Sequence, residues 1–219
     1  MSVSIISSLY NRKHFGSCVL LLVLGSLVYG NHLHNSFQFD TVAYIMNQHR
    51  LDNINEQLTI NYLFKDFFHR SLLQISIAFN AHLDGFRTFS YHLINLVLHL
   101  INCLLVYFIT LRTWFYLKSV NSEHKENEIH FIALFTAVLF LLHPIQTESV
   151  VYIMSRSEVF AGTFYLCSIL LFQVYISKDW PRRVGFKFVV LFIPVFFLIG
   201  FSVKQTLITL PLVLLLYFL

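Results

Sequence analysis

The chain has 219 residues, of which 57% are hydrophobic and only 12% carry a charge. Soluble domains contain about twice that charged fraction, so the composition excludes a soluble globular domain. The formal net charge of +4 is small and does not indicate a nucleic-acid partner. The composition instead predicts a protein with several membrane-spanning helices, for which the lipid bilayer is the first partner.

Six apolar segments approach or reach the length of about 17–25 residues that a bilayer requires. They occupy residues 15–29, 91–117, 129–142, 159–176, 184–201 and 207–219. We therefore predict an all-α, polytopic membrane helix bundle in a single transmembrane domain. The first segment could instead be a signal peptide preceded by "NRKH", but the many later spans favour an uncleaved anchor. The last segment is still apolar at Leu219, so we expect the chain to be the front part of a longer protein.

Lys and Arg residues in short loops indicate the orientation of such a bundle. If the spans alternate, one side of the membrane receives Arg12, Lys13, Arg112, Lys118, Lys125, Lys178, Arg182, Arg183 and Lys187. We expect that side, and with it the amino terminus, to be cytoplasmic. The segment 31–90 then lies on the outer side. Its stretch "NYLFKDFFHRSLLQISIAFNAHL" mixes apolar and charged residues, which predicts amphipathic helices at the membrane interface.

The second span carries four polar residues at spacings of 3, 4 and 3, which places them on one helix face. They are His92, Asn95, His99 and Asn102. Polar side chains within a span normally face the bundle interior, where they hydrogen-bond to neighbouring helices. His92 lies nearest the outer end, so we select it as a candidate binding residue.

Charged residues also gather at the predicted outer end. In "HPIQTESVVYIMSRSE", a helix beginning at Pro144 would bring Glu148 close to Arg156, either as a structural ion pair or as a site for a charged ligand. Lys204 reaches the same end, where it could extend to the interface or bind a phosphate together with Arg156. Asp40 follows the first span on this side, where an isolated Asp would otherwise be read as a turn former.

Four stretches carry a resemblance to a known family, in the order "FQFDTVAYI", "YHLINLVLHL", "LFLLHPIQTESVVYIMSRSEVFAGTFYL" and "FSVKQTLITLPLVLLLY". They resemble the amino-terminal half of the GT-C glycosyltransferases. The similarity is greatest to the transmembrane-and-tetratricopeptide-repeat proteins, which are like protein O-mannosyltransferases, and to their bacterial relatives. The resemblance covers nearly all of residues 30–219.

The resemblance implies a GT-C-like bundle that transfers a sugar from a polyprenyl- or dolichyl-phosphate carrier. The acceptor would be a protein Ser or Thr hydroxyl, a glycan or a lipid, on the lumenal face of the endoplasmic reticulum membrane or the periplasmic face of a bacterial inner membrane. Asp40 would act as the general base, because a hydroxyl is a poor nucleophile until its proton is removed. The leaving phosphate needs cations rather than an acid. The resemblance implies that Arg156 and Lys204 supply them, with His92 nearby, and that Glu148 belongs to the same substrate- and phosphate-binding region.

Three departures from the family pattern keep a second hypothesis open. Thr41 stands where a second acid often follows the first, Gln205 stands where an acid usually follows Lys204, and "FHRSLL" lacks the usual proline. These changes favour a non-catalytic or incomplete relative that binds a lipid-linked glycan or acts as a membrane scaffold. A divalent metal is possible at sites of this kind, but we assign no metal ligands, because a single Asp without a neighbouring acid coordinates a metal poorly. The three cysteines lie in apolar segments without ligand-like spacing.

Overall fold

The computed structural model describes residues 12–42, 71–120, 126–177 and 182–218. Within these ranges every regular element is a helix, and no strand occurs. The longer helices are α2 (Arg12–Tyr29), α6 (Ser71–Asp84), α7 (Thr88–Val120), α8 (Glu126–Leu142), α10 (Arg156–Ile176), α11 (Arg182–Val203) and α12 (Leu210–Phe218). The shorter ones are η1 (Gly30–His32), α9 (Gln146–Val151), η3 (Ile153–Ser155) and η4 (Gln205–Thr209). The predicted all-α membrane bundle is confirmed.

Four of the described helical segments are long and apolar enough to cross a membrane: Arg12–His32, Thr88–Trp114, Ile153–Ile176 and Val184–Val203. The segments Asn127–Leu142 and Gln205–Tyr217 are apolar helices of shorter length. All six predicted spans fall on these helices, but the crossing of the two shorter ones stays a prediction. Of the predicted outer segment, residues 43–70 lie outside the described part of the chain.

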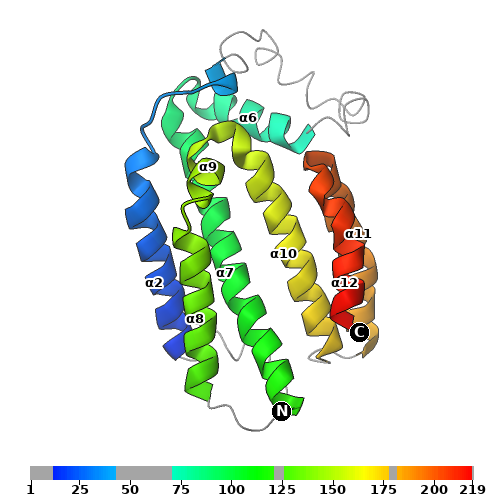
Figure 1. The fold of residues 1–219 in the computed structure, drawn as a ribbon. Helices are drawn as coiled ribbons and strands as arrows, with labels where there is room; N and C mark the ends of the chain where they lie inside the picture. The colour runs from blue at the N-terminus through cyan, green and yellow to red at the C-terminus, as the bar shows by residue number, and fades with distance from the viewer. Residues whose placement is uncertain (1–11, 43–70, 121–125, 178–181, 219) are drawn as a thin grey trace.

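The long helices stand roughly side by side, with α2 and α8 on one flank, α7 and α10 in the middle, and α11 and α12 beyond α10 (Figure 1). One end of this bundle, at the top of Figure 1, carries α9 and is crossed by α6, which runs from the top of α7 toward α11. We call this the upper end, and the opposite end the lower end.

Small residues allow α2, α7 and α8 to pack closely. Ala133 and Ala137 of α8 are fully buried, in a core that also contains Leu21 and Tyr107. Gly25 of α2 faces this core as well. Between helices in a bilayer, close van der Waals contact and polar bonds replace the hydrophobic driving force, so small residues favour association.

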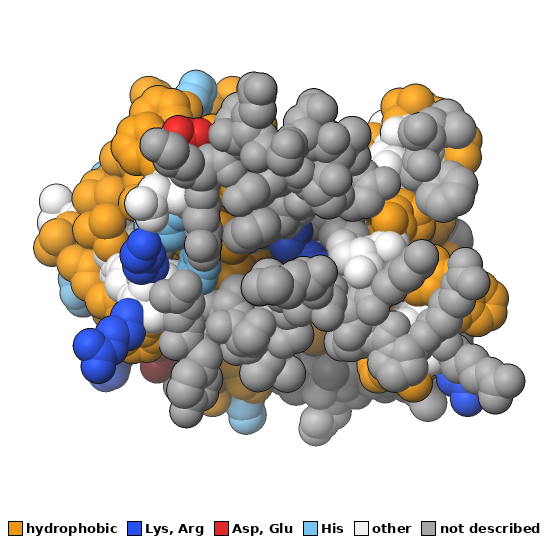
Figure 2. Space-filling model, turned by 90° about the horizontal axis from the view of Figure 1, so that it is seen from below, with side chains coloured by type: hydrophobic (Ala, Val, Ile, Leu, Met, Phe, Trp, Pro, Cys, Tyr) orange, Lys and Arg blue, Asp and Glu red, His pale blue; other side chains and the backbone are white. Residues whose placement is uncertain are grey.

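The lower end carries polar and basic groups. Lys13 donates a 2.9 Å hydrogen bond from Nζ to Oδ1 of Asn127, which joins the first residues of α2 to those of α8. Deeper in the same end, Nδ1 of His14 lies 2.7 Å from the hydroxyl of Tyr107. Figure 2, which looks at this end, shows Lys and Arg side chains here. The side chains of the predicted loop cations Lys118, Lys125, Lys178, Arg182 and Arg183 lie outside the described part of the chain. The orientation of the bundle in a membrane stays a prediction.

Candidate functional site

Arg156 forms the centre of a buried polar network at the upper end. It is the first residue of α10, and its side chain is 0% exposed. Its Nε donates to Oδ1 of Asn95 (2.8 Å), and its Nη1 donates to Oδ1 of Asn80 (2.8 Å) and to Oγ of Ser76 (3.1 Å). Its Nη2 donates to the carbonyl of Tyr91 (2.8 Å). The guanidinium therefore joins α6, α7 and α10, and a ligand could reach it only by displacing one of these partners.

The chain between Glu148 and Arg156 is not the single helix that the sequence predicts. The helix α9 ends at Val151, and Tyr152 adopts extended backbone (φ −82°, ψ 115°) before η3 and α10 follow. This break turns Arg156 into the bundle interior, whereas the side chain of Glu148 is exposed on α9. Within the described part of the chain the two do not form an ion pair, so the structural pair considered from the sequence was wrong.

Asp40 directly follows a loop that packs against the top of α7, and it is the first of the helical residues 40–42. Phe39 adopts a left-handed backbone conformation (φ 49°), which is unusual for a bulky residue and turns the chain sharply just before Asp40. The Phe39 ring contacts Tyr152 edge-on, with 6.1 Å between ring centroids. The carboxylate of Asp40 is exposed, while the next side chain, Thr41, is buried. The loop thus holds its one acid outward at the upper end.

His92 is buried beneath this loop. Its Nε2 lies 3.2 Å from the carbonyl oxygen of Asn35, and its ring is 4% exposed. One helical turn further along α7, Asn95 donates from Nδ2 to the carbonyl of Tyr152 (3.3 Å). The Asp40 loop, His92 and the Arg156 network therefore meet around Tyr152.

Lys204 lies on the other side of α10 and forms an ion pair with Glu158. Lys204 has an extended backbone and lies between α11 and η4. The side chain of Lys204 is 29% exposed and that of Glu158 is 43% exposed. Glu158 follows Arg156 by two positions on the same helix, and side chains two positions apart on a helix point in widely different directions. The predicted cations Arg156 and Lys204 therefore have different partners in this structure, Arg156 on neutral oxygens and Lys204 on a carboxylate.

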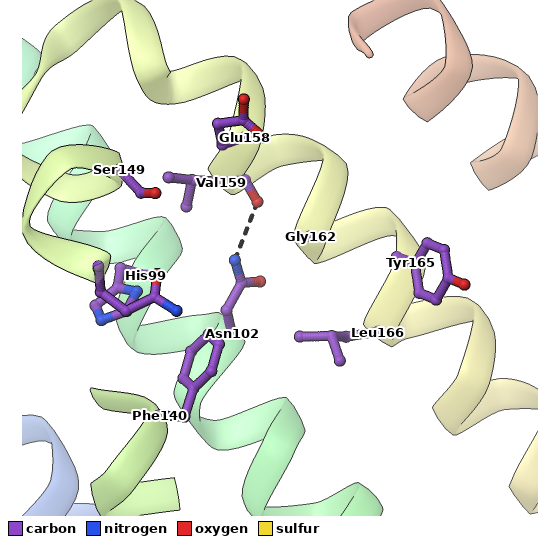
Figure 3. Close-up of a pocket in the computed structure, with 10 residues that line it drawn as sticks. His99, Asn102, Phe140, Ser149, Glu158, Val159, Gly162, Tyr165 and Leu166 are labelled. Atoms are coloured by element: carbon purple, nitrogen blue, oxygen red, sulfur yellow. Dashed lines mark hydrogen bonds between the residues drawn. The ribbon is translucent and has the colours of Figure 1, made fainter. Parts of the chain in front are cut away.

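An open groove of about 340 Å³ lies between α7, α8–α9 and α10 (Figure 3). Its upper part is polar and includes Ser149 and Glu158, whereas Phe140 and Leu166 line a more apolar part. Asn102 donates from Nδ2 to the carbonyl of Val159 (3.0 Å), and its buried Oδ1 has no hydrogen-bond partner within the described ranges. The groove therefore offers acceptor oxygens next to an apolar wall.

Gly162 of α10 keeps the groove open beside Asn102. A Cβ at this glycine would lie 3.3 Å from Nδ2 of Asn102, which is closer than most real contacts. The side chain of His99 also lines the groove, and it is 1% exposed. The polar face of the second span thus supplies one wall of the groove as well as the contacts to neighbouring helices.

Four of the five predicted site residues fall into two groups, and Glu148 stands apart, exposed on α9. Asp40, His92 and Arg156 lie around Tyr152, while Lys204 lies near the groove because its partner Glu158 lines it. Sequence reasoning missed Glu158, Asn80 and Ser76 as contributors. The sequence did contain one indication that α6 contributes: Ser76 and Asn80 are four residues apart, which places both on one face of an amphipathic stretch. The described residues contain no group of three His, Cys, Asp or Glu side chains placed to hold a metal.

Comparison with known proteins identifies relatives of this chain, although no protein-family profile and no solved structure matches it. Mouse protein O-mannosyl-transferase TMTC1 is 27% identical over 172 residues, which cover 72% of this chain and 17% of the relative. The human TMTC1 protein is 27% identical over 193 residues, which cover 80% of this chain and 20% of the human protein. A Caenorhabditis elegans protein O-mannosyl-transferase is 26% identical over 205 residues, which cover 88% of this chain and 26% of the worm protein. The chain is a distant relative of the TMTC proteins.

The predicted resemblance is thereby confirmed, since the relatives include several proteins named protein O-mannosyl-transferases. The similarity to the human protein extends over four fifths of this chain, so it is not confined to one apolar helix. The chain spans about a quarter or less of the length of these three curated proteins.

Proposed function

We propose that this chain forms part of a glycosyltransferase that transfers a sugar from a polyprenyl- or dolichyl-phosphate carrier to a hydroxyl acceptor. The observation that carries the proposal is the similarity to proteins named O-mannosyl-transferases over 72–88% of this chain. The acceptor would be a protein Ser or Thr, or a glycan. The upper end is the place of reaction, because the exposed acid and the exposed ion pair lie there.

In this proposal Asp40 is the general base. The acceptor oxygen attacks the anomeric carbon while its proton passes to the Asp40 carboxylate. The bond between the anomeric carbon and the phosphate oxygen breaks, and the carrier phosphate leaves with the electron pair. The exposure of Asp40 supports this role, because the carboxylate can be approached by an acceptor without rearrangement of the bundle.

Lys204 is the first cation that a carrier phosphate would meet. Its ion pair with Glu158 is partly exposed, so a phosphate oxygen could share or replace the carboxylate. Arg156 and His92 remain proposed contributors to phosphate binding, although both are buried and direct contact with either requires one of its present partners to move. Glu148, exposed on α9 at the same end, is proposed to accept hydrogen bonds from sugar or acceptor hydroxyls.

We propose that the groove of Figure 3 holds the carrier lipid near its head group. Phe140 and Leu166 suit an isoprenoid chain, and Glu158 lies where the head group would be. The basic residues at the lower end support a cytoplasmic position of that end in the endoplasmic reticulum or bacterial inner membrane. The upper end would then face the lumen or periplasm.

The test compares Asp40→Asn with Asp84→Asn in the full-length protein, reconstituted in lipid nanodiscs with a radiolabelled polyprenyl-phosphate hexose and a Ser/Thr-rich peptide. Asp84 is a matched control because it is an acid on α6 at the same end of the bundle. We expect Asp40→Asn to lower kcat by about 100-fold or more, with normal insertion and lipid binding. Full activity of Asp40→Asn would remove the base assignment. Lipid binding without turnover in the wild type would favour a non-catalytic binder.

A further inference from the structure

We infer that Thr41 and His92 together bind one water molecule beneath the Asp40 loop, and that this linked pair positions the Asp40 carboxylate. The catalytic part of this inference rests on the proposed function, whereas the binding of the water does not. It assigns His92 a positioning role and gives Thr41 a function where the family often has a second acid.

A small cavity between the loop and α7 is the first observation. Its volume is about 10 Å³, and its lining includes Thr41, His92 and Tyr152. A cavity of roughly 10–15 Å³ is sufficient for one water molecule if polar partners are present. The cavity therefore has the size of a single water site.

Two buried polar atoms of this lining have no hydrogen-bond partner among the residues that the structure describes. They are Oγ1 of Thr41, whose residue is 0% exposed, and Nδ1 of His92, whose residue is 4% exposed. Buried polar atoms are almost always hydrogen-bonded to the protein or to an ordered water. Because both residues line the same small cavity, we place one water there as the partner of both atoms.

The protonation of His92 follows from its other nitrogen. The carbonyl oxygen of Asn35 can only accept, so Nε2 of His92 carries the proton in this contact. In the neutral ring Nδ1 is then a hydrogen-bond acceptor. A water molecule can donate to this nitrogen and accept the hydroxyl proton of Thr41, which satisfies both atoms.

This arrangement fixes the loop at two points on one ring. Asn35 contacts one nitrogen of His92, and Thr41 reaches the other through the water. Asp40 lies between these two points and directly precedes Thr41. Movement of Thr41 therefore moves the carboxylate, and small misplacement of a reacting group lowers the rate strongly.

The experiment uses the full-length protein with Thr41→Val, which keeps the shape but removes the hydroxyl, and Thr41→Ser as the control that keeps it. Three readouts are taken: solvent density at the site in a high-resolution structure, amide hydrogen exchange of residues 35–42, and steady-state sugar transfer. We expect the water in wild type and Thr41→Ser, and its loss in Thr41→Val with faster exchange. In Thr41→Val kcat should fall about tenfold with KM for the lipid donor unchanged.

Each outcome decides one part of the inference. Absence of ordered water in the wild type, or unchanged exchange in Thr41→Val, would overturn the water site. A lost water with unchanged kcat would overturn the positioning role. If the wild-type protein transfers no sugar at all, the proposed function fails, and density and exchange still decide the water site.

Discussion

Nη1 of Arg156 donates a 2.8 Å hydrogen bond to Oδ1 of Asn80, which ties the first residue of α10 to the helix that crosses the upper end of the bundle. The same nitrogen reaches Ser76, one turn earlier on α6. Both partners are neutral, so Arg156 binds α6 through the geometry of its fork rather than through an opposite charge. A planar guanidinium with several fixed donors suits this task better than a lysine ammonium.

Replacement of Arg156 by Met should therefore release α6 from the bundle. The change leaves the side-chain oxygens of Asn80 and Asn95 without their donor, and each buried unpaired group costs about 1–3 kcal/mol. The carbonyl of Tyr91 keeps its bond within α7. We expect a loss of about 3 kcal/mol or more in unfolding free energy, measured by denaturation in nanodiscs. Arg156→Lys should lose an intermediate amount. Arg87→Met, at an exposed position of the same end, is the control and should change little.

Hydrogen exchange of α6 separates this explanation from general instability. If Arg156 acts by docking α6, exchange within Ser71–Asp84 should accelerate more than exchange in α2 or α8 in the Arg156→Met protein. Equal acceleration in all helices would contradict a local docking role.

Periodicity in the sequence predicted the inward face of the second span correctly. Its four polar residues are all buried, at 4% exposure or less, because one helix with spacings of 3 and 4 must present them on a single side. Helix pattern alone could not show which partners they contact. Asn95, for example, meets Arg156 only because Tyr152 breaks the preceding helix and redirects the chain.

Partners distant along the chain were beyond the reach of the sequence. From the sequence we looked for an acidic partner of Lys204 at the next position, which is Gln205. In the structure the acidic partner is Glu158, on another helix. The ion pair between Lys204 and Glu158 depends on how α11 packs against α10. That packing is set by many apolar side chains rather than by a local motif. The same limit applies to Asn80, whose role follows from the path of α6 across the upper end.

A charge exchange at Lys204 and Glu158 should distinguish pairing from phosphate binding. Each single change, Lys204→Glu or Glu158→Lys, places like charges together, while the double change restores an ion pair. Because the pair is partly exposed, we expect each single change to cost about 1 kcal/mol or less in unfolding free energy, and the double change to recover it. If Lys204 also binds the carrier phosphate, the double variant should be stable yet show a raised KM for the lipid donor. Recovery of both stability and KM would limit Lys204 to pairing.

Gly200 should not tolerate a larger side chain. An added Cβ would lie 3.1 Å from Cβ of Phe164 on α10 and would also strike the side chain of Leu207. Overpacking of this kind usually costs about 1–3 kcal/mol, so Gly200→Ala should lower thermal stability. Gly16, where an added Cβ meets nothing within 4 Å, provides the control. Gly16→Ala should be neutral or slightly stabilising because alanine favours a helix. Equal effects at the two glycines would contradict close packing of α11 at Gly200.

Gln173 should fix α12 to the bundle near the lower end. Its Nε2 donates to the hydroxyl of Tyr217 (2.7 Å) and to Oγ1 of Thr113 (2.8 Å), which links α10, α12 and α7. Tyr217→Phe removes this acceptor and also the contact of the Tyr217 hydroxyl with Oγ1 of Thr113 (3.0 Å), while Gln173 keeps Thr113 as a partner. We therefore expect a loss of about 1 kcal/mol, roughly twice the average for one such bond between membrane helices.

Gln173→Leu and Gln173→Glu test the same contact from the other side. Oε1 of Gln173 is buried without a partner in the protein, so Gln173→Leu removes an unsatisfied atom together with the donor, and the two effects offset each other. Gln173→Glu instead removes the donor and buries a carboxylate beside two oxygen atoms, which should be far more costly. Denaturation of the three variants in nanodiscs should therefore rank Gln173→Glu well below Tyr217→Phe, with Gln173→Leu close to wild type. A Gln173→Leu protein as unstable as Gln173→Glu would show that the donor contributes much more than the buried oxygen costs.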